Sequence, residues 1–364
     1  DRAVITYTSR VRQAYKGVPV IIGGIEASLR RLSHYDYWSD SIRRSILLDS
    51  KADLLVYGMG ERPLAEIVRL LSTGTPASEI TGIPGTVWKT REPSTAEGEL
   101  LELPPFEDLE DRSFAESTRV RLENQDPFTA RPLAERYGDW HVVQAPPAHS
   151  LGTDELDRLY ALPFSRKWHP RYDAAGGVPA LEEVRFSITA SRGCFGGCSF
   201  CALGLHQGRI VTSRSHKSIL EEARTFTRNP DFKGIIHDVG GPTANFRVAS
   251  CAKQTAGGCC PDRQCLYPEP CSALAADHTG LKELLEELRS LPGIKKVFIR
   301  SGIRYDYLLE DRDEGFFDDL VRHHVSGQLK VAPEHASRKV LEAMGKPPIE
   351  VFSKFAKAFR AKSS

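Results

Sequence analysis

The sequence has 364 residues, more than a single hydrophobic core usually organises, so two domains are expected. Its 49 basic and 48 acidic residues give a net charge of +1, which excludes a global electrostatic preference for nucleic acid. No window reaches about eighteen uncharged apolar residues and no secretory signal is recognisable, which predicts a soluble, cytoplasmic protein without membrane contact.

The N-terminal part predicts a Rossmann-like α/β domain over residues 1–95. Residues 18–24 and 52–61 are apolar runs that contain glycines at or near their ends, and a helical pattern follows the second run. Residues 35–50 have apolar side chains at helical spacing, which predicts a further helix. Strand, glycine turn and helix, repeated, are typical of an α/β unit.

Residues 96–180 predict a helical connector, because polar residues and prolines interrupt the apolar pattern. Two short helices are expected within it, near 112–124 and 129–137.

Residues 181–364 predict a partial (β/α) barrel of the TIM type. A full barrel takes ~250 residues, so this segment provides half to three-quarters of one. Because the chain does not begin with Met and stops just after a helical pattern, we expect a piece of a longer protein. The expected strands cover 183–191, 232–241, 294–302 and 327–335, and the expected helices cover 215–229, 280–291, 313–325 and 337–345.

All eight cysteines lie between 194 and 271, which points to metal binding rather than to a scattered disulfide framework. Cys194, Cys198 and Cys201 follow the first barrel strand, where such folds carry their chemistry. Their spacing lets three sulfurs bind one face of a [4Fe-4S] cluster and leaves one iron open. A zinc site with a distant fourth ligand, a disulfide with a spare thiol and three packed thiols are the alternatives.

Glycines and an aromatic residue surround these cysteines. Gly193, Gly196 and Gly197 allow the backbone to bend tightly around a cluster, and Phe200 adds an aromatic wall.

Cys-x3-Cys-x-aromatic-Cys after a first barrel strand resembles the signature of the radical S-adenosylmethionine (SAM) superfamily. The flanking segments resemble one branch of it, the YgiQ-type radical SAM proteins, through nearly the whole chain and most loosely over about 85–150. The segments that carry the resemblance are "PVIIGGIEASLRRLSHYDYWSD", "SKADLLVYGMGERPLAEI", "RGCFGGCSFCALGLHQGR", "DVGGPTANF" and "KVAPEH".

The resemblance implies a [4Fe-4S] cluster on the three cysteines, with SAM bound through its amino and carboxylate groups to the open iron. One electron would cleave SAM into methionine and a 5′-deoxyadenosyl radical that abstracts a substrate hydrogen. An electron donor such as flavodoxin or ferredoxin is implied as a partner.

The resemblance also places SAM-binding residues at the ends of later strands. Gly240 and Gly241 would present backbone groups to the SAM amino nitrogen, or they form a plain turn. Ser301 and Arg304 are candidates for the SAM carboxylate or ribose, although an arginine on a loop can equally be a surface residue. Glu334, with His335 beside it, would face the cavity mouth, or these residues cap the next helix.

A second cysteine group occupies residues 251–271 and forms an insertion in the barrel. Cys251, Cys260, Cys265 and Cys271 provide four ligands, enough for a closed iron-sulfur cluster or a structural zinc ion, and the spacing does not decide between them. Disulfides or uncoordinated thiols are the alternative. Cys259 is an additional cysteine.

The glycine turns of the N-terminal unit resemble those of cobalamin-binding domains. Because no Asp-x-His-x-x-Gly motif is present, either the motif precedes the given sequence or the Rossmann-like domain binds no cobalamin, and we favour the second interpretation. Residues 29–45 mix arginines with tyrosines and a tryptophan, a composition suited to RNA or to an anionic substrate, or else to a solvated helix.

Two functions follow from the sequence. The first is a radical SAM enzyme with an unknown substrate, for which methylthiotransferase-like modification of tRNA or protein is the nearest specific hypothesis. The second is a non-catalytic iron-sulfur or zinc-binding module. RNA is not indicated as a partner by any added domain.

Overall fold

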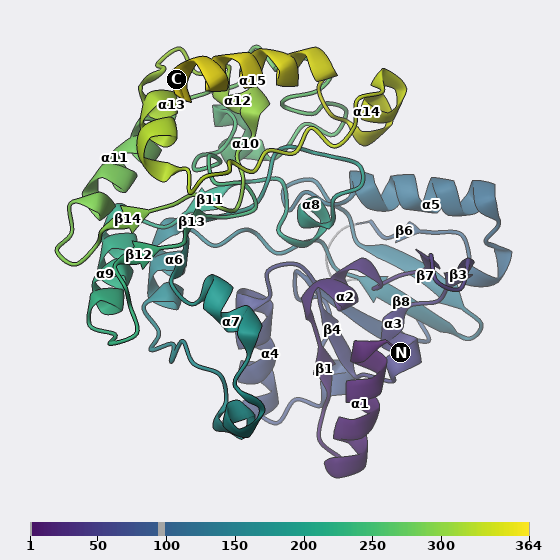
Figure 1. Cartoon of the computed structure of the whole chain (residues 1–364). Coiled ribbons are helices and arrows are strands. Elements are labelled where there is room, and N and C mark those ends of the chain that lie inside the picture. The colour runs from purple at the N-terminus through teal and green to yellow at the C-terminus, as the bar shows by residue number, and fades with distance from the viewer. Residues whose placement is uncertain (1, 94–98, 364) are drawn as a thin grey trace. The chain divides into compact units, whose positions relative to one another are not determined.

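A computed structural model describes residues 2–93 and 99–363 of the chain, which adopts a mixed α/β fold (Figure 1). The chain forms two compact units. Unit 1 contains Asp1–Ser150, Cys201–Gly208 and Gly257–Pro261. Unit 2 contains Leu151–Phe200, Arg209–Ala256 and Asp262–Ser364.

Unit 1 is built around a sheet of six strands in the order β1-β4-β5-β8-β7-β6. β1 and β4 pair in parallel, as do β6 and β7, while the other neighbours pair antiparallel. The strands are β1 (Ile21–Ile22), β4 (Leu54–Val56), β5 (Thr86–Thr90), β6 (Leu101–Glu102), β7 (Leu133–Tyr137) and β8 (Trp140–Gln144).

Both faces of this sheet are covered, because successive strand residues enter two separate apolar clusters. Val142 belongs to one cluster and Val143 to the other. The first face packs against α1 (Ala3–Ala14), α2 (Gly24–Leu29), α3 (Ile46–Ser50) and α5 (Asp111–Glu123), and the second against α4 (Glu61–Ser72). Unit 1 is therefore a three-layer α/β/α sandwich.

The segment 35–50, expected to be a helix, begins instead as a hairpin of β2 (His34–Asp36) and β3 (Ser41–Arg43). The Asp36 carboxylate accepts the Ser39 N–H at 3.1 Å and Asp40 adopts a left-handed φ of 47°, so polar contacts favour a turn over the helical pattern.

The segment 96–180 differs from the expected connector, because its first part completes the sheet of unit 1. The helix expected near 112–124 is confirmed as α5, but 129–137 contains strand β7. β7 and β8 form a hairpin whose last pair is Tyr137 with Trp140, and Gly138 provides the left-handed turn at φ 58°. The sheet thus extends beyond the predicted boundary at residue 95.

Unit 2 places consecutive parallel strands side by side. β9 (Ser187–Thr189) pairs with β13 (Asp238–Gly240). β12 (Ile235–Ile236), which comes directly before β13 in the chain, pairs with β14 (Lys296–Val297). Helices α9 (His216–Thr227) and α11 (Thr279–Arg289) form the connections and bury one apolar face each against the strands.

The expected fourth barrel strand, 327–335, is reduced to a single parallel bridge between Ile303 and Val331. The helices before and after it are α12 (Tyr305–Leu308), α13 (Gly315–Asp319), a π-helical turn (Leu320–His324), α14 (Arg338–Met344) and α15 (Ile349–Ser363). The mixed α/β class is confirmed, and the barrel and Rossmann-like arrangements stay predictions.

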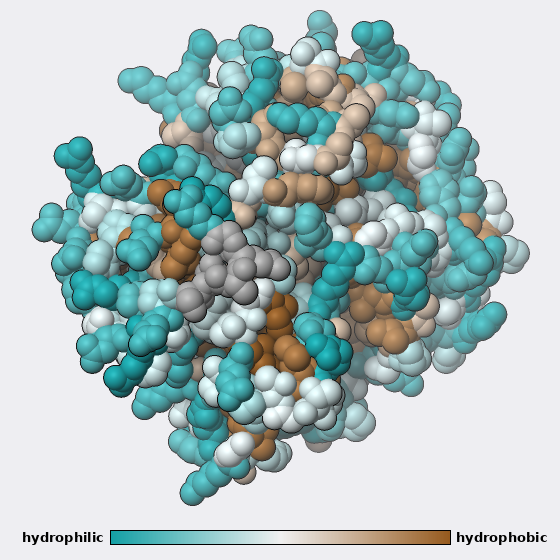
Figure 2. Space-filling model, turned by 180° about the vertical axis from the view of Figure 1, so that it is seen from behind, coloured by the Kyte–Doolittle hydropathy of each residue, from teal (hydrophilic) through white to brown (hydrophobic). Residues whose placement is uncertain are grey.

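The surface of the chain is mainly polar where it can be seen. Figure 2 shows one face of the molecule, on which hydrophilic residues predominate and hydrophobic residues form separate patches. Within the described residues, none of the helices combines the length and the apolar character that crossing a bilayer requires.

Replacement of Ile67 by Ala should lower the free energy of unfolding of unit 1 by about 2–5 kcal/mol, because this fully buried side chain joins α4 to the sheet. Replacement of the adjacent, exposed Val68 by Ala is the matched control and should change it by less than about 0.5 kcal/mol. Urea unfolding followed by circular dichroism measures both. Equal effects would contradict the assigned packing of α4.

Candidate functional site

The loop with the first cysteines begins after β10 (Ser191–Arg192), which pairs antiparallel with β11 (Thr212–Ser213). Gly193 has a left-handed φ of 85°, and a Cβ atom there would overlap the carbonyl oxygen of Ile210. Only glycine fits at this position, as the sequence predicts.

A buried ion pair lies beside Cys198. Nη1 of Arg304 donates to Sγ of Cys198 at 3.7 Å, and Nε and Nη2 of the same guanidinium donate to the two carboxylate oxygens of Asp306. Arg304 and Asp306 are only 8% and 3% exposed. Gly196 makes room for the guanidinium, because a Cβ atom at this position would overlap Nη1. The arrangement aims a fixed positive charge at a cysteine sulfur.

Burial opposes the charged form of Arg304, but the Asp306 carboxylate and the sulfurs of Cys198 and Cys194 outweigh burial and raise the pKa of Arg304. The guanidinium is therefore permanently charged. Arg304 is therefore a buried residue bonded to Asp306 and Cys198, and not the exposed surface arginine that the sequence left open as the alternative.

A second buried cation, Lys346, lies in the same region. Its Nζ is 3.9 Å from Oε1 of Glu334, which adopts a left-handed φ of 73°. Burial and the charge of Arg304 lower the pKa of Lys346. Nδ1 of His335 accepts the Ser337 N–H at 2.8 Å just before α14, and the N-cap residue Ser337 makes no side-chain capping bond, so the capping alternative stays a prediction.

The cysteine loop is also tied to the end of α14 and to the second cysteine insertion. Ser199 donates its N–H to Met344 O at 3.0 Å and its hydroxyl to Ala343 O at 2.7 Å. Gln264 donates to Gly197 O at 2.8 Å. These bonds fix the backbone on both sides of Cys198.

The predicted glycine pair closes a tight junction between strand ends. A Cβ atom at Gly240 would overlap Oγ of Ser301, and a Cβ atom at Gly241 would lie 2.6 Å from Ser191 O. Asp238 holds the turn after β14 by accepting the Ser301 N–H at 3.0 Å. The structure thus brings Gly240, Gly241 and Ser301 together in unit 2, as expected from parallel strands that end at one edge.

Ser191 completes this junction and was not predicted. Its Oγ is buried and has no hydrogen-bond partner in the part of the chain that the structure describes. A buried hydroxyl without a partner is unfavourable, so it marks a position for a ligand atom. Only its place immediately before the cysteine motif could have indicated it.

The aromatic wall of the cysteine loop differs from the expected one. Phe200 is 52% exposed, whereas Phe195 is fully buried and stacks on Phe246 with ring centroids 3.7 Å apart. Cys194 and Cys265 both pack against the apolar cluster that contains these two rings. Members of both cysteine groups therefore border one dry region of unit 2.

In the second group, the sulfurs of Cys251 and Cys271 lie close enough to Cys265 to affect its pKa. Burial raises the pKa of Cys265, the Ser250 hydroxyl at 3.2 Å lowers it, and the other two sulfurs raise it further. The Cys271 N–H donates to Cys265 O at 2.9 Å, which closes the insertion on itself.

Cys259 and Cys260 belong to unit 1. There Asp126 accepts the Cys259 N–H at 2.7 Å. The predicted ligand Cys260 is thus in a different unit from the three thiols described above.

All eight cysteines are thiols. Among residues 2–93 and 99–363, no group of three or more His, Cys, Asp or Glu side chains is placed so that it could hold a metal ion. Cys194 and Cys198 belong to unit 2 and Cys201, which precedes α8 (Ala202–His206), to unit 1. Both predicted ligand sets therefore stay predictions.

The environment of Cys194 and Cys198 nevertheless fits an iron-sulfur cluster. Thiolates are the ligands of such clusters, and nearby N–H donors and positive charge stabilise their negative charge. The Nη1 donor of Arg304 and the space at Gly196 meet these requirements.

The glycine turns of unit 1 contact α8. Gly58 donates its N–H to Oγ of Ser28 at 3.0 Å, and the same hydroxyl lies 2.9 Å from Nδ1 of His206. A Cβ atom at Gly58, whose φ is 73°, would lie 3.4 Å from His206 O. The turn at 58–61 thus holds the helix that directly follows Cys201.

The family model described as Radical SAM N-terminal matches residues 1–187. A UPF0313 protein of Clostridium botulinum strain 657 is 50% identical over 361 residues, which cover 99% of this chain and 56% of the relative. A UPF0313 protein of Clostridium perfringens strain 13 is 50% identical over 361 residues and is covered to 54%. The chain spans about half the length of the curated relatives that it matches.

Two solved structures share the fold. Both are of TsrM, a radical S-adenosylmethionine methyltransferase from Kitasatospora setae, one with tryptophan and the SAM analogue aza-SAM and the other with cobalamin and a [4Fe-4S] cluster. Each has a TM-score of 0.51 over 99% of this chain and 50% of TsrM, with 17% and 16% sequence identity.

Replacement of Arg304 by Met should destabilise unit 2 by about 3–5 kcal/mol, because it leaves the Asp306 carboxylate buried without its partner. The double change Arg304→Met with Asp306→Leu should destabilise it clearly less. Urea unfolding measures both, with Arg300→Met as the control, since the Arg300 side chain is partly exposed and its ion pair with exposed Glu183 is long, at 3.5 Å. A double variant no more stable than the Arg304 variant would refute the pairing.

Proposed function

Because the chain belongs to the Radical SAM N-terminal family of the radical SAM superfamily, we propose that it is an enzyme that cleaves SAM reductively at a [4Fe-4S] cluster. Cys194, Cys198 and Cys201 are the proposed cluster ligands. The full-length relatives extend well beyond this chain, so the complete activity is expected to involve residues outside it.

The observation that carries the proposal is the buried guanidinium of Arg304, 3.7 Å from Sγ of Cys198. A fixed positive charge favours a thiolate over a thiol and stabilises the negative charge of a thiolate-bound cluster. The close approach at Gly196 keeps this donor against the loop. A purely structural cysteine has no need of a charged donor in a dry site.

Gly240, Gly241 and Ser301 are proposed to bind the SAM amino acid and ribose groups, and the Ser191 hydroxyl offers a further contact. Arg304 is committed to Asp306 and Cys198, which favours a positioning role at the cluster over the expected bond to the SAM carboxylate.

Lys346 is a better candidate cation for the carboxylate, since its ion pair with Glu334 is long, with Nζ 3.9 Å from Oε1. Glu334 then lines the same site, as predicted.

When bound, the cluster would supply one electron, from a flavodoxin- or ferredoxin-type donor, for the cleavage of SAM into methionine and a 5′-deoxyadenosyl radical that would abstract a substrate hydrogen. The apolar cluster around Phe195 and Phe246 excludes water from the neighbourhood of Cys194. Methylthiotransferase-like modification remains the nearest hypothesis for the substrate reaction.

The proposed site lies in a partial (β/α) barrel that follows a Rossmann-like domain in the sequence. Two parallel strand pairs, β9 with β13 and β12 with β14, support the barrel. The parallel pair of β1 and β4, each followed by a glycine turn, supports the Rossmann-like domain. The second cysteine group is proposed to bind a structural zinc ion or a closed cluster through Cys251, Cys260, Cys265 and Cys271. Its nearness to the apolar cluster that contacts Cys194 suits a role in electron relay.

Anaerobic reconstitution with iron and sulfide tests the catalytic proposal. The protein should gain a dithionite-reducible cluster whose electron paramagnetic resonance spectrum changes with SAM, and should form 5′-deoxyadenosine. Cys198→Ala should abolish 5′-deoxyadenosine formation, because the cluster loses one of three ligands, whereas Cys259→Ala should leave it nearly unchanged. Zinc uptake without any response to SAM would instead establish a non-catalytic metal-binding module.

Metal analysis separates the two cysteine groups. A variant with Cys194, Cys198 and Cys201 all replaced by Ala should lose the SAM-responsive cluster but retain the metal of the second group. Cys271→Ser in that background should release the remaining metal, because a closed site needs its fourth ligand. Metal that persists after both changes would refute the proposed second ligand set.

A further inference from the structure

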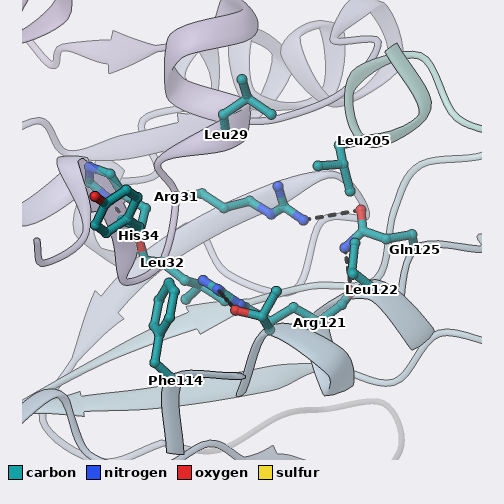
Figure 3. A pocket seen from close by; sticks show the side chains of 11 residues that line it. Leu29, Arg31, Leu32, His34, Phe114, Arg121, Leu122, Gln125 and Leu205 are labelled. Carbon is teal, nitrogen blue, oxygen red and sulfur yellow. Dashed lines mark hydrogen bonds between the residues drawn. The ribbon is translucent and has the colours of Figure 1, made fainter. Parts of the chain in front are cut away.

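Unit 1 contains a pocket of about 180 Å³ lined by residues of α2, α5 and α8 and of the segment 31–35 (Figure 3). Its walls are largely apolar, and the side chains that form them are Leu29, Leu32, Phe114, Leu122 and Leu205. Leu29 and Leu122 are exposed, so they belong to the mouth of the pocket. The dimensions suit a small molecule rather than a polymer.

Arg31, the first of two guanidiniums in this pocket, is 6% exposed. Its Nε donates to Oε1 of Gln144 at 2.6 Å and its Nη2 to Oε1 of Gln125 at 3.1 Å, while Nη1 donates to Ser28 O. Figure 3 shows the head group extended across the pocket toward Gln125. All three acceptors are neutral, so the charge is held in place without being compensated.

Arg121 of α5 provides the second guanidinium. Its Nη2 donates to Oγ1 of Thr118 at 2.9 Å and its Nη1 to Ser33 O, and its Cζ lies 5.6 Å from the centre of the Phe114 ring. Its acceptors are again neutral. Burial lowers the pKa of Arg121, and it lowers that of Arg31 to about 10, so both remain charged near neutral pH.

One buried carboxylate, that of Glu135, lies near the second of these cations. Glu135 is fully buried and accepts the Ser33 N–H at 2.7 Å together with the hydroxyls of Ser33 and Tyr137. It lies near enough to Arg121 to influence it, but it makes no ion pair with either guanidinium in the described part of unit 1. Two cations against one carboxylate leave one positive charge in excess, which is unfavourable in a buried site without an anion.

The neighbouring arginines of the 29–45 stretch differ from Arg31 because each of them has a carboxylate partner. Arg30 pairs with Glu26 at 2.8 Å, and Arg44 and Arg43 both pair with Asp49. The composition of this stretch is suited to RNA or an anionic substrate, or else to a solvated helix, and among its arginines it is Arg31 that is buried without a carboxylate partner in the described part of unit 1.

His34 adds a polar atom to the pocket lining. Its Nδ1 lies 3.2 Å from Leu32 O, and its Nε2 is buried without a hydrogen-bond partner among the described residues. Burial lowers the pKa of His34 to about 4, so the ring is neutral and Nε2 is an acceptor. A buried acceptor without a partner supports the assignment of this cavity as a ligand site.

We propose that this pocket binds a small organic carboxylate with an apolar body. One excess positive charge matches a monoanion, the two guanidiniums present N–H donors suited to carboxylate oxygens, and the leucine and phenylalanine walls match an apolar body. The apolar walls offer few donors to a phosphate dianion. All of these residues belong to unit 1, so the inference is independent of the cluster chemistry proposed above.

Isothermal titration with benzoate, on the whole chain without metal, tests the proposal. Benzoate should bind saturably, while benzyl alcohol, which has no charge, and inorganic phosphate should bind at least about 10-fold more weakly. Arg121→Met should weaken benzoate binding by about 10- to 100-fold. Arg119→Met is the matched control, because Arg119 lies on the same helix, is exposed and pairs with Glu123, and it should not change the affinity.

A second variant keeps the test decisive should loss of Arg121 impair folding. Leu122→Trp enlarges an exposed side chain at the pocket mouth and leaves both guanidiniums in place, so it should weaken benzoate binding without lowering the melting temperature of the unliganded protein. Binding that is absent in the unmodified chain, that is stronger for phosphate, or that is unaffected by both Arg121→Met and Leu122→Trp would overturn the proposal.

Discussion

Parallel pairing of short strands is the constraint on which the candidate site of unit 2 depends. β9, β13 and β14 run in the same direction, so the chain segments that follow them emerge at one edge. That edge leaves no room for side chains at Gly240 and Gly241, and the Asp238 carboxylate fixes the turn by accepting the N–H groups of Arg300 and Ser301. The cysteine loop begins at the same junction, directly after Ser191.

Local sequence pattern was sufficient for the elements whose apolar faces are strongly periodic. Helices α4, α9 and α11 lie where the pattern places them, because each buries a continuous apolar stripe. The pattern failed at 35–50 and at 129–137, where a turn decides the outcome. Asp36 with Ser39 and the left-handed Gly138 favour hairpins, and neither contact is visible in hydrophobic periodicity.

In the candidate site, too, nearby sequence predicts some residues, whereas other residues are brought in by contacts between distant parts of the chain. The positions of the cysteines and glycines follow from their spacing along one loop, and the structure uses Gly193 and Gly196 as expected. Arg304 was a candidate only through the family resemblance, and no local pattern indicates its contact with Cys198, which lies 106 positions away. In unit 1, likewise, composition cannot distinguish Arg31 from Arg30, because only burial and pairing make them different.

The two hydrogen bonds of Ser199 have a consequence for the order in which the protein matures. Its hydroxyl bonds to a carbonyl group 144 residues further along the chain, at the end of α14. During synthesis from the N-terminus, the segment around Cys198 is therefore complete long before the ribosome has released the residues that hold it. Until Ala343 and Met344 emerge, the backbone next to Cys198 lacks both of these bonds, so the loop reaches its final conformation only after α14 has been synthesised.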